Sequence, residues 1–78
     1  MKDQLKLGTI QMIDRDNRFG IITEEPEGMT KYSYASESVT FDIDDTTPEL
    51  REGQLVQFLK VDDERGTRAT RIAVLTQK

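Results

Sequence analysis

Two short stretches of the chain bring aromatic rings next to basic side chains. In the first, Arg18 precedes Phe19, and Ile21 follows two residues later. The second stretch reads Lys31-Tyr32-Ser33-Tyr34. Side chains two apart on a β-strand share one face of the sheet, so each stretch would present its large side chains together. Exposed rings beside cations form a surface on which unpaired bases stack, which makes base stacking the candidate chemistry.

The aromatic residues also have a purely structural interpretation. Phe19, Tyr32 and Tyr34 could pack inside a barrel, as large aromatic residues commonly do. Against this, Ile22 has the opposite parity from Phe19 and suits a core position. Two tyrosines around a serine also suit a face that meets water. The sequence leaves both interpretations open, and the exposure of the rings decides between them.

The composition narrows the function classes. The chain has 78 residues, a net charge of −4, and neither Cys nor His. The commonest general base and any thiolate metal site are therefore missing, and Asp42-x-Asp44-Asp45 lacks the glycine and later glutamate of a calcium loop. No carboxylate pair comes with a second catalytic group. We expect a binding protein without a metal, cofactor or small-molecule substrate, and not an enzyme.

The sequence also carries expectations about location. The N-terminus lacks the apolar run of a signal peptide, and no stretch is apolar enough to span a membrane. We therefore expect a cytoplasmic protein with no membrane partner.

Charge is unevenly distributed along the chain. Residues 37–49 are acidic, which indicates either a solubilising surface or a site for a basic partner. Residues 65–78 contain only basic charges, which favour equally a charged edge strand and a stripe that follows phosphates. Arg18, Lys31 and Arg65 are candidates for phosphate contacts or for stacking on bases, and ordinary solvated charge is the alternative.

Alternating β-branched residues and turn clusters predict five short strands and no helix. The predicted strands are Gly8–Ile13, Phe19–Thr23, Lys31–Ala35, Gln54–Val61 and Thr67–Leu75. Residues 36–52 are predicted as a long solvated loop, with a short strand at Val39–Phe41 as the alternative. Closure removes open sheet edges, so we expect one domain over residues 1–78 that is an all-β, five-stranded antiparallel Greek-key barrel.

In its motifs the chain resembles the cold-shock domain, the five-stranded oligonucleotide-binding barrel (OB-fold) of bacterial cold-shock proteins. The resemblance covers roughly residues 7–75. Leu7-Gly8-Thr9-Ile10 resembles the family's opening Lys-Gly-Thr-Val, and Phe19-Gly20-Ile21-Ile22 resembles its Phe-Gly-Phe-Ile motif. The residues at 31–34 fall where the second aromatic motif lies. The best match is Leu50-Arg51-Glu52-Gly53-Gln54-Leu55-Val56-Gln57-Phe58, followed by Arg65-Gly66.

The departures from the family fall on its ligand-binding face. Met12 stands where the family has Trp, Ile21 replaces the second Phe of the first motif, and Ala35 replaces the last Phe of the second. Tyr34 is similar to the family's His in position. The resemblance implies a nucleic-acid-binding site made of Met12, Arg18, Phe19, Ile21, Lys31, Tyr32, Tyr34 and Arg65.

Two functions are compatible with this pattern. The resemblance implies a protein that binds single-stranded RNA or DNA with little sequence preference and acts as an RNA chaperone. The alternative is a cold-shock-like barrel that no longer binds nucleic acid. In that case Met12, Ile21 and Ala35 would form a surface for a protein partner or a homodimer.

Overall fold

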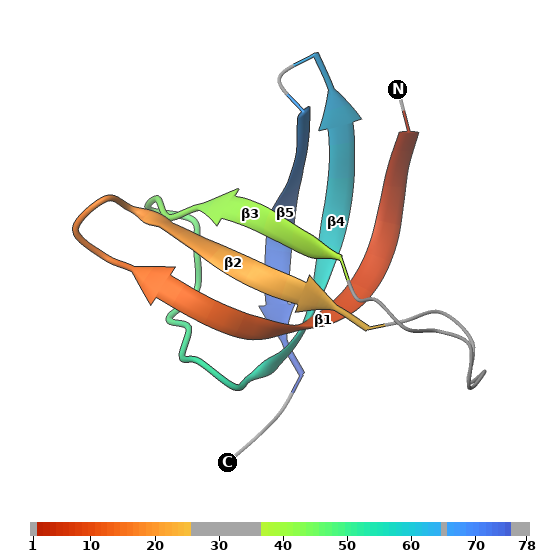
Figure 1. Cartoon of the computed structure of the whole chain (residues 1–78). Coiled ribbons are helices and arrows are strands. Elements are labelled where there is room, and N and C mark those ends of the chain that lie inside the picture. The colour runs from red at the N-terminus through yellow and green to blue at the C-terminus, as the bar shows by residue number, and fades with distance from the viewer. Residues whose placement is uncertain (1, 26–36, 65, 76–78) are drawn as a thin grey trace.

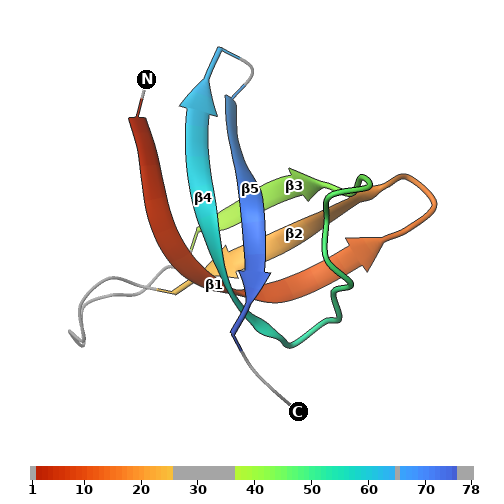
Figure 2. The same ribbon diagram turned by 180° about the vertical axis from the view of Figure 1, so that it is seen from behind.

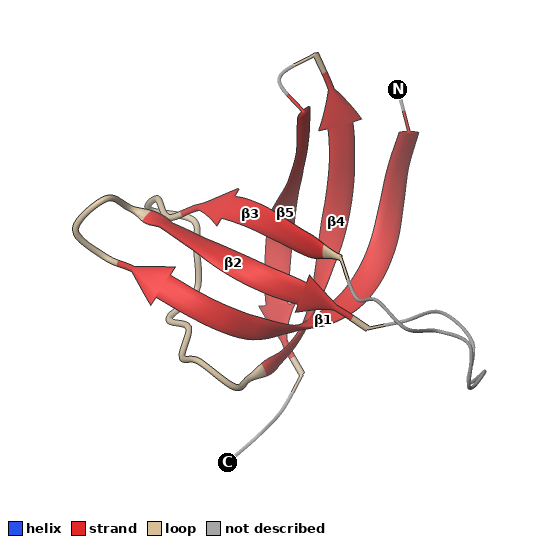
Figure 3. Cartoon of the chain, in the orientation of Figure 1, coloured by secondary structure: helices blue, strands red, loops and turns tan. Residues whose placement is uncertain are grey.

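The described part of the chain forms five strands joined by turns and loops. The structure is a computed structural model that describes residues 2–25, 37–64 and 66–75. In this part every regular element is a strand (Figure 1 and Figure 3). The strands are β1 (Lys2–Asp14), β2 (Phe19–Glu24), β3 (Ser38–Asp42), β4 (Leu55–Asp63) and β5 (Gly66–Val74).

The strands close into one barrel in the order β1-β2-β3-β5-β4. Four neighbouring pairs are antiparallel, and β3 and β5 are parallel through Thr40 with Arg68 and Phe41 with Ala69. The parallel pair follows from the path of the chain. In the sequence β4 comes between β3 and β5 and runs opposite to β5, so that β5 runs in the same direction as β3. The predicted all-β five-stranded barrel is confirmed, with the correction that one of its pairs is parallel.

The strand boundaries agree with the sequence except in two places. β1 begins at Lys2 instead of Gly8, because its first half pairs with β4. The third described strand is Ser38–Asp42, in the segment predicted mainly as loop, so the alternative at Val39–Phe41 is confirmed. The predicted strand over Lys31–Ala35 lies outside the described residues.

A bulge lets β1 serve two partners. Lys2–Thr9 pairs with β4, Gly8–Asp14 pairs with β2, and the register shifts between Ile10 and Met12. An additional residue in one strand bends that strand, and the curve of β1 is plain in Figure 1. Near the bend, the amide of Ile10 donates to the carbonyl of Gln54 at 2.9 Å, which anchors the start of β4.

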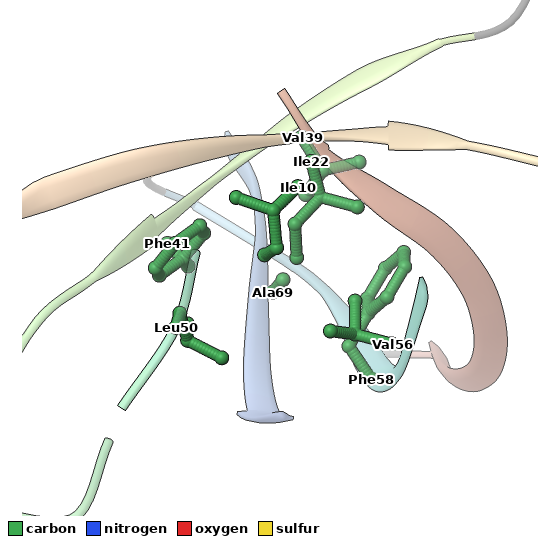
Figure 4. Close-up of a cluster of buried hydrophobic side chains, with 8 residues drawn as sticks. All are labelled: Ile10, Ile22, Val39, Phe41, Leu50, Val56, Phe58 and Ala69. Carbon is green, nitrogen blue, oxygen red and sulfur yellow. The ribbon is translucent and has the colours of Figure 1, made fainter. Parts of the chain in front are cut away.

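The core fills the barrel with alternate residues of the strands. Figure 4 shows its eight buried hydrophobic side chains, which are Ile10, Ile22, Val39, Phe41, Leu50, Val56, Phe58 and Ala69. Gly20 is the direct partner of Phe41 across β2 and β3. A Cβ atom on Gly20 would collide with Cζ of the Phe41 ring and would lie 2.9 Å from the carbonyl oxygen of Met12. The ring therefore occupies the space that a side chain at position 20 would need.

The loop over residues 43–54 is tied to the turn between β1 and β2. Leu50, near its middle, is 3% exposed and belongs to the core. The Arg15 guanidinium donates to the carbonyl of Leu50 at 3.1 Å, and the amide of Ile43 donates to the carbonyl of Arg18 at 3.0 Å. These contacts fix the loop although it carries no strand of its own (Figure 2).

A charged cluster lies beside the start of the loop that follows β2. The Lys60 ammonium is 2.6 Å from Oε2 of Glu24 and 3.0 Å from Oε1 of Glu37. Glu24 is buried, and its Oε2 has the Lys60 ammonium as its ion-pair partner among the described residues. Contact with Glu24 first and Glu37 second raises the pKa of Lys60, while partial burial opposes the rise.

Candidate nucleic-acid interface

The outer face of β1, β2 and β3 carries three of the predicted site residues, Met12, Phe19 and Ile21, together with their partners in register. Along β2, Phe19 and Ile21 are partly exposed, whereas Gly20 and Ile22 between them are buried. We call the set Met12, Asp14, Phe19, Ile21, Thr40 and Asp42 the candidate face. Its side chains share one side of the sheet because they have the same parity across three paired strands.

One row of the candidate face is apolar. Met12 is the direct partner of Ile21, and Ile21 is the direct partner of Thr40. Met12 and Ile21 are both partly exposed, and Thr40 is exposed. In this row the unbranched side chain of Met12 and the β-branched side chain of Ile21 offer an apolar surface to a flat base. Neither side chain is aromatic, so neither can stack on the base as a ring does.

The neighbouring row places carboxylates on both sides of the ring. Phe19 pairs with Asp14 on β1 and with Asp42 on β3. Cross-strand partners on one face have Cβ atoms about 4.5–5.5 Å apart, so both carboxylates border the ring. Asp14 also accepts from the amide of Asn17 at 3.1 Å and from its side-chain nitrogen at 2.9 Å. The Asn17 side chain, followed by its backbone, lowers the pKa of Asp14.

Arg18 lies in the turn between β1 and β2, directly before Phe19 of the candidate face. Its φ is 62°, in the left-handed region that residues other than glycine seldom occupy. The turn is held by the Asp14–Asn17 hydrogen bonds and by the contact of Ile43 with the Arg18 carbonyl. The Arg18 side chain is exposed, so a cation is present at the end of the β2 row that contains the ring.

Polar side chains continue the sheet surface beyond the apolar row. The hydroxyl of Thr23 donates to Oε1 of Gln11 at 2.6 Å, and the hydroxyl of Ser38 donates to the same oxygen at 3.4 Å. Gln11 is the exposed residue of the β1 bulge, and its side chain thus bridges three strands. Its amide nitrogen has donors for a further acceptor.

The structure therefore brings together half of the predicted site. Met12, Phe19 and Ile21 share the candidate face, and Arg18 adjoins it. The other predicted residues, which are Lys31, Tyr32, Tyr34 and Arg65, lie outside the residues that the structure describes.

Sequence reasoning missed the two carboxylates that border the ring. Asp14 directly follows the predicted strand Gly8–Ile13, and Asp42 lies among the acidic residues 37–49, so neither was a candidate for the site. The signal for Asp42 was its alternation with Val39 and Phe41, which gives it the parity of an outward-facing strand residue.

Neither a metal-binding group nor a membrane-spanning helix occurs among the described residues. Among residues 2–25, 37–64 and 66–75, no group of three or more metal-ligating side chains is placed to hold an ion. The same residues contain no helix that is long and apolar enough to cross a membrane.

The strand order and the single parallel pair define a small closed barrel that is compatible with an OB-like fold. No family model matches the chain, and no curated protein matches it.

Proposed function

We propose that this protein binds single-stranded RNA or DNA on the candidate face, in the manner of a cold-shock domain. It would bind with little sequence preference and would hold strands unpaired, as an RNA chaperone in the cytoplasm and not as an enzyme. The barrel architecture is compatible with this function, although a fold alone does not fix a function.

The observation that supports the proposal most directly is the orientation of Phe19. Its parity on β2 is that of the outward side chains, and Met12 and Ile21 lie on the same face. A base could stack on this ring and contact the aliphatic row beside it, while Arg18 meets a phosphate. Stacking on one ring contributes about 1–3 kcal/mol per base, so affinity depends strongly on whether Tyr32 and Tyr34 add their rings.

A second candidate is a protein-interaction surface on the same face. The observation that favours it is the placement of Asp14 and Asp42 on either side of Phe19. Carboxylates next to the ring repel a phosphate backbone and would suit a partner with basic side chains. The aliphatic pair Met12 and Ile21 would supply the apolar centre of such an interface.

The experiment that tests the proposal is fluorescence anisotropy of a labelled single-stranded pyrimidine oligonucleotide, titrated with the protein at low and moderate salt. We expect saturable binding that weakens with salt, because phosphate contacts release counterions. Phe19→Ala and Tyr32→Ala should each reduce affinity about fivefold or more, from the stacking contribution of one ring.

Leu5→Ala is the matched control. Leu5 is 65% exposed on β1, but it lies opposite Leu59 of β4 and not on the candidate face. Its loss should leave binding unchanged. Absence of binding at low salt would reject the proposal. Concentration-dependent association in light scattering, abolished by Ile21→Lys, would then support the interaction surface.

A further inference from the structure

A groove with a volume of about 400 Å³ opens on the outside of the barrel, between β5 and the loop that follows β3. This volume is within the range of about 300–1,000 Å³ typical of small-ligand sites. Its two walls carry opposite charges. Asp42, Asp44 and Thr47 line one wall, and Arg68, Thr70 and Arg71 line the other.

The groove begins where the parallel pairing of β3 and β5 ends. The last paired residues are Phe41 and Ala69, after which β3 gives way to the loop over residues 43–54 (Figure 2). Asp42 belongs both to the candidate face and to the groove. In addition, the apolar row of Met12, Ile21 and Thr40 continues to Arg68, the partner of Thr40. A strand that crosses the candidate face toward β5 therefore arrives at the groove.

Arg71 is placed by an irregularity of β5. Gln57 pairs with Ala73 and Leu59 with Thr70, so β5 contains one residue more than β4 between these pairs. Arg71 lies in this bulge with a φ of 54°, a left-handed conformation that is unusual for arginine. Bulges re-aim side chains, and this one sets Arg71 at the groove. Its exposed guanidinium makes no hydrogen bond or ion pair with any residue that the structure describes.

The two carboxylates that line the groove, those of Asp42 and Asp44, have different surroundings. Oδ1 of Asp44 accepts from the amide and hydroxyl of Thr46 at 2.8 and 2.7 Å, and from the hydroxyl of Thr47 at 3.3 Å. These bonds, with Thr46 first, lower the pKa of Asp44 and keep it charged. Asp42 is exposed, and its carboxylate has no hydrogen-bond partner in the described part of the chain. Asp42 and Arg71 thus line the groove, and neither side chain has a partner among the described residues.

A ligand for such a groove must satisfy both signs of charge. A simple anion would meet the carboxylates, and a simple cation would meet the guanidiniums. A nucleotide meets both requirements. Its phosphate accepts two parallel hydrogen bonds from a guanidinium, and its base can donate hydrogen bonds to a carboxylate. Guanine presents two adjacent N–H donors on its pairing edge, which match the two oxygens of one carboxylate.

We propose that this groove binds a guanine nucleotide unit of a single strand, with Arg71 on its phosphate and Asp42 on the pairing edge of its base. This inference rests on the proposed function and adds a guanine preference to it. The experiment compares a labelled pyrimidine oligonucleotide with the same oligonucleotide carrying one central guanine. We expect the guanine strand to bind on the order of tenfold more tightly, as one bidentate base contact gives.

Substitutions in the groove test whether its residues cause the guanine preference. Asp42→Asn and Arg71→Gln should each abolish the preference for the guanine strand. Arg71→Gly should abolish it as well while relieving the left-handed conformation, so a loss of folding cannot explain that result. Arg51→Gln is the control, because it removes one exposed arginine from a loop position outside the groove lining.

Titration with guanosine monophosphate distinguishes failure of this inference from failure of the proposed function. We expect amide NMR shifts at Thr46, Thr70 and Arg71, and the same shifts in Phe19→Ala. Equal affinity for the two strands, or a guanine preference that survives Asp42→Asn and Arg71→Gln, would overturn the groove assignment alone. Binding of the mononucleotide without binding of either strand would support the groove and reject the function proposed for the candidate face.

Discussion

Phe19 of β2 and Asp42 of β3 are direct partners across the outer face of the barrel. The ring that is best placed to stack on a base therefore has a carboxylate beside it, and Asp14 borders it from β1. A phosphate backbone that follows the stacked base must pass these charges. The arrangement favours a strand whose phosphates point away from the row of Phe19, toward Arg18 or β5.

Removal of one of these charges should strengthen binding of a strand that lacks guanine. We predict that Asp42→Asn raises affinity for a pyrimidine oligonucleotide about two- to fivefold at low salt, because one exposed charge contributes about 0.2–1 kcal/mol. The gain should fade at high salt, where exposed charges are screened. Anisotropy titrations over a salt series measure it. An unchanged affinity at low salt would mean that the carboxylate lies off the path of the strand.

Gly20 is predicted to tolerate no larger residue. Gly20→Ala would push a methyl group into the Phe41 ring and toward the Met12 carbonyl, so we expect a loss of about 1–3 kcal/mol in the free energy of unfolding. Urea denaturation followed by circular dichroism measures the loss. The double variant Gly20→Ala/Phe41→Leu, which shortens the side chain opposite, should cost less than the sum of the two single changes. Additive costs would contradict the steric explanation.

The cluster around Lys60 is predicted to make stability depend on alkaline pH. Contact with Glu24 raises the pKa of Lys60 above its ordinary value of 10.5. The folded state therefore holds this proton more tightly than the unfolded state. The stabilisation is complete below about pH 10.5 and is lost as the pH rises through the higher folded value. Unfolding free energies measured from pH 8 to above pH 11 should show this loss, and Glu24→Gln should reduce it.

Removal of the Lys60 charge tests the same cluster at neutral pH. Lys60→Met leaves the buried Glu24 carboxylate without its ammonium, and we expect a cost of about 1–3 kcal/mol. Replacement of both partners, as in Lys60→Met/Glu24→Leu, should recover most of that cost. Equal destabilisation in the single and double variants would show that the ion pair does not carry the effect.

Leu50 is predicted to anchor the loop over residues 43–54. Leu50→Ala removes a core side chain from a segment without strands, so we expect a cost of about 2–5 kcal/mol. The neighbouring Glu49→Ala, at an exposed position, is the control and should change stability by no more than about 0.5 kcal/mol. Thermal unfolding of the two variants compares them. Equal melting temperatures would contradict a structural role for the loop.

The sequence predicted the barrel well because the strand signals are local. Phe19, Ile21 and Ile22 alternate in burial as their spacing predicts, and β2, β4 and β5 begin and end near their turn residues. The first half of β1 was missed because Leu5 and Leu7 point outward, opposite the pattern expected for a strand that buries its apolar side chains. Only pairing with β4, far along the chain, makes this segment a strand.

The candidate site could be predicted only in part, since its chemistry depends on register between strands. Met12, Phe19 and Ile21 were selected from spacing and from the resemblance to cold-shock domains. The position of Asp42 beside Phe19 follows from the pairing of β2 with β3, which local spacing does not specify. Arg71 was visible only as one member of a basic stretch, because the bulge that aims it arises from a mismatch between β4 and β5.

The long reach of β1 has a consequence for the order in which the chain can fold. Its first residues pair with β4, and β5 closes the ring by joining β4 to β3. The hairpin of β1 and β2 can form early from nearby residues, but closure requires contacts between the two ends of the sequence. Such long-range contacts slow folding, because the chain must lose much of its freedom before they form. On the ribosome, the first half of β1 therefore stays without its partner strand until β4 has emerged.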